Sequence, residues 1–119
     1  AAGSITCTSV TQTSDRRKKT VLEWDDRYVD ALEDFEPVLF RWVEDPDGIN
    51  VGLIAQDVKK ALEDRGLDAS GIVCGSEKLY TLNYFSIFSL MLAKMKRQQK
   101  QLNDMEKRLE KIERELIMN

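Results

Sequence analysis

The chain has 119 residues, of which 42% are hydrophobic and 33% are charged, so it is long enough for one domain with an extension. Its net charge of −3 argues against a general nucleic-acid binder, because such modules usually carry a basic excess. No apolar run approaches the roughly 18–20 residues that cross a bilayer, and no signal-peptide core is visible, so we expect no membrane partner.

Histidine is absent, so imidazole can be neither a catalytic base nor a metal ligand. Cys7 and Cys74 are isolated and lack the Cys-x-x-Cys spacing of zinc sites. We therefore expect no metal and no cofactor. The two cysteines are predicted to be reduced thiols packed as small apolar groups, and a Cys7–Cys74 disulfide is the alternative.

Residues 1–13 are small and polar, with little apolar surface, and we expect an extended segment that continues something upstream. The next six residues, from Ser14 to Lys19, place a serine in front of a basic cluster. Such a run can be a solvated charged loop. Serine–lysine pairs are also an established variant of nucleophilic catalysis, and they need no histidine.

Helical spacing of apolar residues predicts a short amphipathic helix over residues 25–35, which Pro37 ends. The β-branched and aromatic run 38–43 predicts a strand. Asp-Pro-Asp-Gly at 45–48 is typical of a turn, and 49–54 reads as the returning strand of a hairpin.

Residues 56–65 predict a second helix that ends at Gly66. Two short strands are expected at Ile72-Val73 and at 79–82, on either side of a turn at Gly75-Ser76. Residues 14–83 therefore form a small α+β body with short sheets.

Residues 84–119 contain neither proline nor glycine and predict one helix of about 35 residues, about 50 Å long. An unbroken heptad register runs along it, so this stripe must meet copies of itself or another protein. The a positions are Phe88, Met95, Leu102, Leu109 and Leu116, and the d positions are Met91, Gln98, Met105 and Ile112.

The heptads favour parallel assembly, because Arg108 then meets Glu113 of the neighbouring helix. Leucine at a with isoleucine at d favours more than two helices. The polar Gln98 is expected to fix the register of the helices at some cost in stability.

Four sequence blocks resemble those of one family, the C-terminal intramolecular chaperone domain of bacteriophage tailspikes, tail fibres and neck appendages, the endosialidase type. The same domain type occurs in some membrane-bound eukaryotic transcription-factor precursors. The resemblance covers about residues 14 to 116. The blocks are Ser14, Asp15, Arg17 and Lys19 of a Ser-Asp-x-Arg-x-Lys signature; Pro37, Val38, Phe40 and Trp42; Gly52 to Val58; and Asn83-Tyr84 at the start of the helix.

The resemblance implies a homotrimer with a three-stranded coiled coil, which assembles and registers a fibre shaft upstream in the same polypeptide. It further implies a self-cleaving serine peptidase that cuts between Thr13 and Ser14, with Ser14 as nucleophile, Lys19 as base, and Asp15 and Arg17 in support. Residues 1–13 would then precede the cut, as in an unprocessed precursor. Lys18 departs from the family's usual aliphatic residue, and so does the stretch 20–24, which bears on the rate of cleavage.

The resemblance places assembly in the host cytoplasm, with the parent protein in the virion tail or appendage and the chaperone part released after cleavage. Three other functions are compatible with the residues. The first is a trimerisation cap that does not cleave itself. The second uses the basic stretch from Lys94 to Lys100 to contact nucleic acid, although the low overall basicity disfavours it. The third is a hydrolase for an external substrate, for which no catalytic arrangement is visible.

Overall fold

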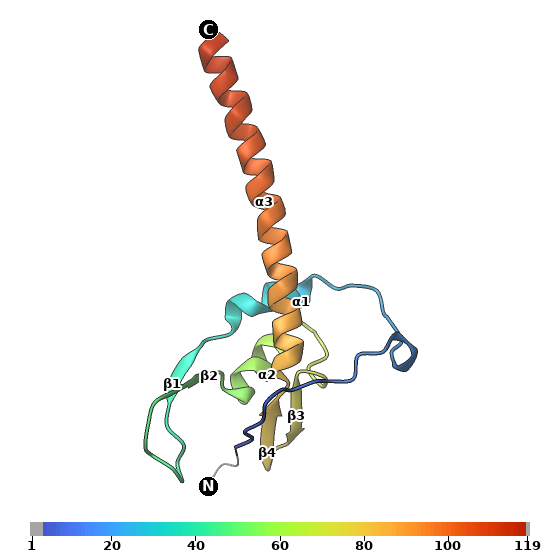
Figure 1. The fold of residues 1–119 in the computed structure, drawn as a ribbon, viewed down its shortest axis with the longest axis vertical. Coiled ribbons are helices and arrows are strands. Elements are labelled where there is room, and N and C mark those ends of the chain that lie inside the picture. Colours follow the sequence, from blue (N-terminus) through green and yellow to red (C-terminus); the bar gives the residue numbers. More distant parts are fainter. Residues whose placement is uncertain (1–3, 119) are drawn as a thin grey trace.

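A computed structural model describes residues 4–118 (Figure 1). Residues 1–3 of the predicted upstream segment and Asn119 of the predicted helix lie outside the described residues. Short helices and two small antiparallel sheets are followed by one long helix, which confirms the α+β fold class. The elements are η1 (Arg16–Lys18), α1 (Arg27–Ala31), η2 (Leu32–Asp34), β1 (Val38–Phe40), β2 (Asn50–Gly52), α2 (Ala55–Asp64), β3 (Val73–Ser76), β4 (Leu79–Leu82) and α3 (Tyr84–Met118).

The first hairpin pairs β1 with β2, with Val38 opposite Gly52 and Phe40 opposite Asn50. The prediction of a hairpin is confirmed, but both strands are shorter than expected. All residues from 41 to 49 are exposed, so none of their side chains packs into a core that would support a longer ladder.

The second hairpin pairs β3 with β4, and Ser76 lies opposite Leu79. The predicted turn at Gly75-Ser76 is therefore wrong, because the chain reverses at Glu77 and Lys78. Gly75 lies within β3 with a φ of 90°, and a Cβ there would collide with the carbonyl oxygen of Leu79. This glycine permits a close approach between strands instead of forming the turn.

Helix α2 ends as predicted at Gly66, which has a φ of 72°. The amide N–H of Gly66 donates to the Glu63 carbonyl at 2.9 Å, and that of Leu67 donates to the Leu62 carbonyl at 3.0 Å. This is the hydrogen-bond pattern of a Schellman motif. The motif turns the chain so that Leu67 joins the core.

The core lies between α1, α2, the second hairpin and the first turns of α3. No polar or charged residue is buried among the described residues. Its buried members are Ala31, Phe35, Val58, Ala61, Leu62, Leu67, Ala69, Ile72, Val73, Ile87 and Leu90.

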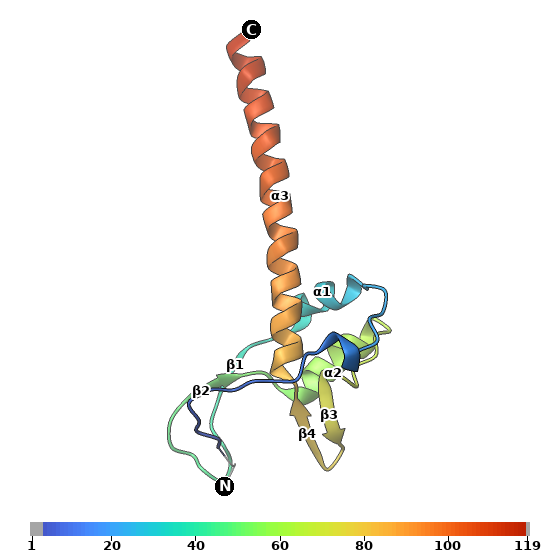
Figure 2. The same ribbon diagram turned by 45° about the vertical axis from the view of Figure 1, so that its right-hand side comes forward.

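Helix α3 leaves the body as a single rod (Figure 2). Its first turns bury Ile87 and Leu90 against the body, whereas every described residue after Arg97 is exposed. The prediction of one long helix is confirmed. A lone helix of this length gains little from intrinsic propensity, and packing of an apolar face is the usual source of stability.

Both cysteines are free, but both are exposed. The expectation that they pack as small apolar groups is therefore wrong. Cys74 lies in β3, with its Sγ only 3.9 Å from the carbonyl oxygen of Ser70, and its side chain stays at the surface.

Candidate functional site

Ser14 and Lys19 are brought together by the short turn η1. The amides of Lys18 and Lys19 donate to the carbonyls of Asp15 and Arg16 at 3.0 and 3.2 Å, and this turn folds the chain back on itself. Lys19 Nζ then donates to Ser14 Oγ at 2.8 Å. The two predicted catalytic side chains are thus in direct contact, five residues apart in sequence.

Asp15 and Arg17, the predicted supporting residues, hold this turn. Asp15 Oδ1 accepts from the Arg17 amide at 2.8 Å, and the carboxylate also pairs with the guanidinium at 2.8 Å. The side-chain hydrogen bond from Arg17, followed by the one from its amide, lowers the pKa of Asp15, and the same pairing raises the pKa of Arg17. Asp15 therefore pairs with Arg17, and the Lys19 amine contacts Ser14 instead of this carboxylate.

The contact between Ser14 and Lys19 is fully open to solvent. Every residue from 4 to 24 is exposed, including both sides of the bond between Thr13 and Ser14. Figure 1 shows η1 at the tip of a loop that stands away from α3. Within a single chain Ser14 and Lys19 are in contact, but no other described part of the protein shields them from water.

The predicted oligomer stripe is exposed along α3. Its apolar members from Phe88 to Leu116 are between 49 and 71% exposed, and Gln98 is exposed among them. The other side of the helix carries Ile87 and Leu90 into the core, and Arg97 Nη1 lies 2.7 Å from Asp30 Oδ1 of α1. The body therefore occupies one side of α3 and leaves the heptad stripe uncovered.

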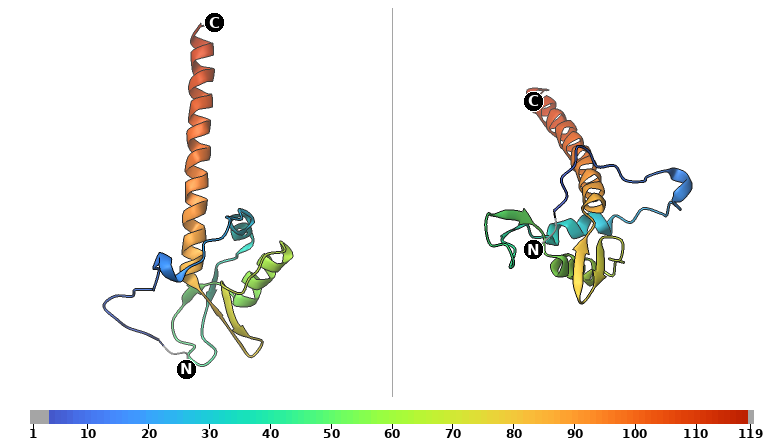
Figure 3. Two further views of the ribbon diagram at one scale, coloured as in Figure 1. Left: turned by 90° about the vertical axis from the view of Figure 1, so that its right-hand side faces the viewer. Right: turned by 60° about the horizontal axis from the view of Figure 1, so that its bottom comes forward.

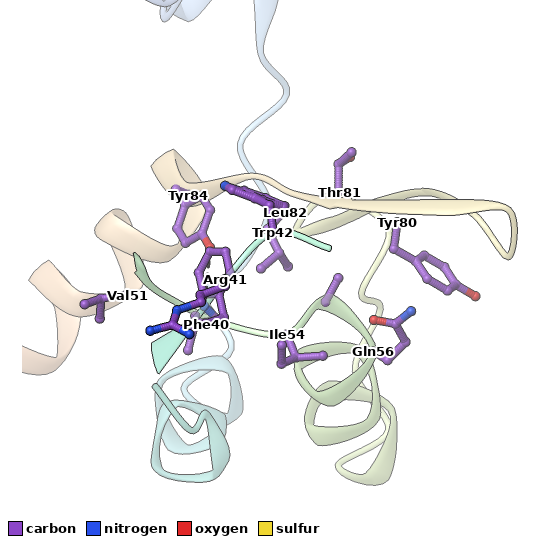
Figure 4. Close-up of a pocket in the computed structure, with 12 residues that line it drawn as sticks. Phe40, Arg41, Trp42, Val51, Ile54, Gln56, Tyr80, Thr81, Leu82 and Tyr84 are labelled. Carbon is purple, nitrogen blue, oxygen red and sulfur yellow. Dashed lines mark hydrogen bonds between the residues drawn. The ribbon is translucent and has the colours of Figure 1, made fainter. Parts of the chain in front are cut away.

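An open, mostly apolar groove of about 630 Å³ lies between the first hairpin, the start of α2, β4 and the start of α3; we call it the groove (Figure 4). Trp42, Leu82 and Tyr84 gather at one end of it and Tyr80 lies at the other. Tyr84 Oη accepts from the Leu53 amide at 3.5 Å, which links the start of α3 to the segment after β2.

The groove and the ion pair between Asp30 and Arg97 are two features that the sequence did not predict. Both depend on residues from distant parts of the chain, which periodicity cannot bring together. Gly52 and Tyr84 did belong to recognised blocks, and their contact explains the glycine. A Cβ at Gly52 would lie 3.1 Å from Phe40 Cε1 and 3.3 Å from Tyr84 Oη.

Within residues 4–118, no group of three or more acidic or cysteine side chains is placed to hold a metal ion. In the same part of the chain, no helix is both long enough and apolar enough to cross a membrane.

Residues 14–67 match the family model described as chaperone of endosialidase, a family also named as peptidases. No curated protein sequence matches the chain significantly. Three chains of known structure do, and one of them is described as a novel intramolecular chaperone. It is 22% identical, with a TM-score of 0.61 over 75% of this chain and 99% of its own length. The structural match supports the fold, and the family match confirms the resemblance over residues 14–67, which contain three of the four sequence blocks.

Proposed function

Since residues 14–67 carry the chaperone-of-endosialidase domain, we propose that this chain is an intramolecular chaperone that releases itself by self-cleavage. It assembles and registers a phage fibre or spike shaft upstream in the same polypeptide, and then cuts the bond between Thr13 and Ser14. The observation that carries the proposal is the 2.8 Å contact between Lys19 Nζ and Ser14 Oγ, inside the matched residues.

The reaction uses the hydroxyl of the residue that follows the scissile bond. Neutral Lys19 accepts the Ser14 hydroxyl proton, and Oγ attacks the carbonyl carbon of Thr13 through a five-membered ring. The C–N bond breaks, the proton passes to the amino group of Ser14, and an ester between Thr13 and Ser14 remains. Water then hydrolyses the ester, which gives a carboxylate at Thr13 and restores the Ser14 hydroxyl.

The lysine must lose its proton for this role. A free lysine has a pKa of about 10.4, so nearly all of it is charged at neutral pH. Burial of an amine in protein favours its neutral form. Since Lys19 is exposed in one chain, burial has to come from neighbouring chains after assembly.

Assembly occurs through the exposed stripe on α3, as a parallel homotrimer. The stripe has no cover within the described chain, and knobs-into-holes packing against identical helices would remove its apolar side chains from water. Helices that assemble first hold three shafts at high local concentration, which offsets the entropy of pairing distant segments between chains. The parent protein then serves in the virion after assembly in the host cytoplasm.

The test is to express the chain with its natural upstream shaft and to measure fragment masses and oligomer mass together. We expect cleavage between Thr13 and Ser14 in a trimer. Ser14→Ala and Lys19→Ala should abolish cleavage with the trimer intact, whereas the controls Ser9→Ala and Lys78→Ala, both at exposed residues, should still be cut. Cleavage in both dyad variants would overturn the mechanism.

A trimerisation cap without cleavage is the second candidate, and the solvent-open site favours it. An intact mass for the assembled wild-type trimer would establish it in place of the peptidase.

A further inference from the structure

The segment that joins the Ser14–Lys19 turn to α1 exposes large apolar side chains. We call residues 20–24 the arm. Val21 is 70% exposed, Leu22 81% and Trp24 60%. Only the indole N–H of Trp24 is engaged, and it donates to Asp26 Oδ1 at 2.8 Å. Three such side chains in five residues form an apolar surface with no cover in the described chain.

The groove offers a concave apolar surface of the same kind. Trp42, Ile54 and Tyr84 all line it, and each is between 39 and 48% exposed. Aromatic side chains in pockets are the usual anchors of protein interfaces. Arm and groove are therefore matched in chemistry as a projecting and a receiving surface.

Within one chain the two segments that carry these surfaces lie on opposite sides of α3. Figure 1 and the right-hand view of Figure 3 show η1 and its loop on one side of α3 and the hairpin of β1 and β2 on the other. An arm on one side and a receptor on the other is the geometry of head-to-tail association, which closes into a ring around a rotation axis. The proposed bundle of α3 helices supplies such an axis.

The charges also complement each other. The loop from Ser14 to Trp24 carries four basic and two acidic residues, whereas the hairpin from Val38 to Gly52 carries one basic and three acidic residues. The side chains of Arg16 and Lys18 make no hydrogen bond or ion pair in the described part of the chain, so they are available for carboxylates of a neighbour. On the arm, Glu23 matches Arg41 in the groove.

We propose that the arm of each chain docks in the groove of the next copy, and that this contact completes the self-cleavage site. The inference rests on the proposed function. Docking of Trp24 and Leu22 draws the neighbouring turn against a second chain, where water is excluded from Lys19 and Ser14.

Crosslinking tests the contact itself. Cys7 and Cys74 are replaced by serine because both are exposed, and Ser14→Ala keeps the chain uncut. In this background, Glu23→Cys chains and Arg41→Cys chains are expressed together and treated with a short bismaleimide. We expect a crosslinked dimer in the mixture and little in either variant alone. A chain with both cysteines should give a covalent ring.

Three crosslinking results would overturn the inference: no product in the mixture, an equal dimer yield from Glu23→Cys alone, or a crosslink confined to the monomer of the double variant.

Cleavage kinetics test the consequence. Trp24→Ala should slow cleavage by about tenfold or more, with the oligomer mass unchanged, because α3 still assembles. Trp24→Phe keeps an apolar ring and should stay within about twofold of wild type, as should the exposed control Leu79→Ala. Equal rates for Trp24→Ala and wild type would overturn the coupling.

The two proposals fail separately. If the cysteine variants crosslink between arm and groove but the wild-type chain never cleaves, only the peptidase proposal is overturned. Normal cleavage without that crosslink would overturn only the docking of the arm.

Discussion

Arg97 of α3 and Asp30 of α1 form an ion pair, with Nη1 2.7 Å from Oδ1, across 67 residues of sequence. The hydrogen bond that Arg97 donates to Asp30 raises the pKa of Arg97, so the guanidinium stays charged at any working pH. The pair lies at the last point where the body touches α3, because every described residue beyond Arg97 is exposed. It fixes the side of the helix on which the body sits.

Loss of this pair should loosen the body on α3 without unfolding it. Both side chains are about one-third to two-fifths exposed, so Asp30→Ala and Arg97→Ala should each lower Tm by roughly 1–5 °C. The double variant should cost less than the sum of the two single changes. Thermal melts at one fixed protein concentration measure this, with Lys60→Ala of the exposed pair on α2 as the control. Strictly additive losses would show that the pair is not coupled.

Gly52 should resist substitution because of space. An added Cβ would lie 3.1 Å from Phe40 Cε1 and 3.3 Å from Tyr84 Oη, so Gly52→Ala must push the hairpin away from α3. We expect a loss of about 1–3 kcal/mol in the free energy of unfolding, measured by denaturant titration. Gly71→Ala is the matched control, since no atom lies within 4 Å of its added Cβ, and it should be neutral. Similar stabilities for the two variants would contradict the close packing.

The pH dependence of the turn should follow Asp15. Its pKa is lowered from the usual 3.8 by Arg17, so its contribution to the turn is complete above that value and is lost as the pH falls through the lowered pKa. Carbon NMR of the Asp15 carboxyl in the Ser14→Ala chain should show this low pKa, and Arg17→Ala should move it upward. Asp25, whose partner is Arg27, provides the internal control and should not move. An unchanged Asp15 titration in Arg17→Ala would refute the assignment.

Gln98 should limit the stability of the assembled helices. A polar side chain at a d position is expected to cost stability while it selects the register. Gln98→Leu should therefore raise Tm at a fixed protein concentration and broaden the distribution of oligomer masses. Gln101→Leu, at a flanking g position, should do neither. A lower Tm for Gln98→Leu would place this residue outside the helix interface.

The elements that the sequence predicted well depend on local signals. The unbroken run of helix formers in α3 and the cap at Gly66 both act within a few residues, so the helix and the helix end they predict follow from local sequence. The misplaced turn at Gly75 shows the limit of such signals. Glycine permits both a tight turn and a close approach between strands, and only the pairing of Ser76 with Leu79 distinguishes them.

The candidate site also has a part that local sequence predicts and a part that depends on tertiary packing. The contact between Ser14 and Lys19 was predictable, because the two residues are five apart in sequence and one short turn brings them together. The groove could not be predicted, since it requires Trp42, Ile54 and Tyr84 from three elements to meet. The exposure of Cys7 and Cys74 was also unpredictable, because the surface around a cysteine is decided by tertiary packing.

The contacts between the body and α3 fix the direction in which the body lies around the helix axis. Ile87, Leu90 and Arg97 hold the body at one direction around the helix axis, and the heptad stripe points in another. Each residue advances an α-helix by about 100°. One residue inserted just after Arg97 would leave the rod and the body intact but turn the distal stripe by that angle. In the proposed bundle, the number of residues between Arg97 and the distal stripe would therefore set how the bodies face one another around the bundle axis.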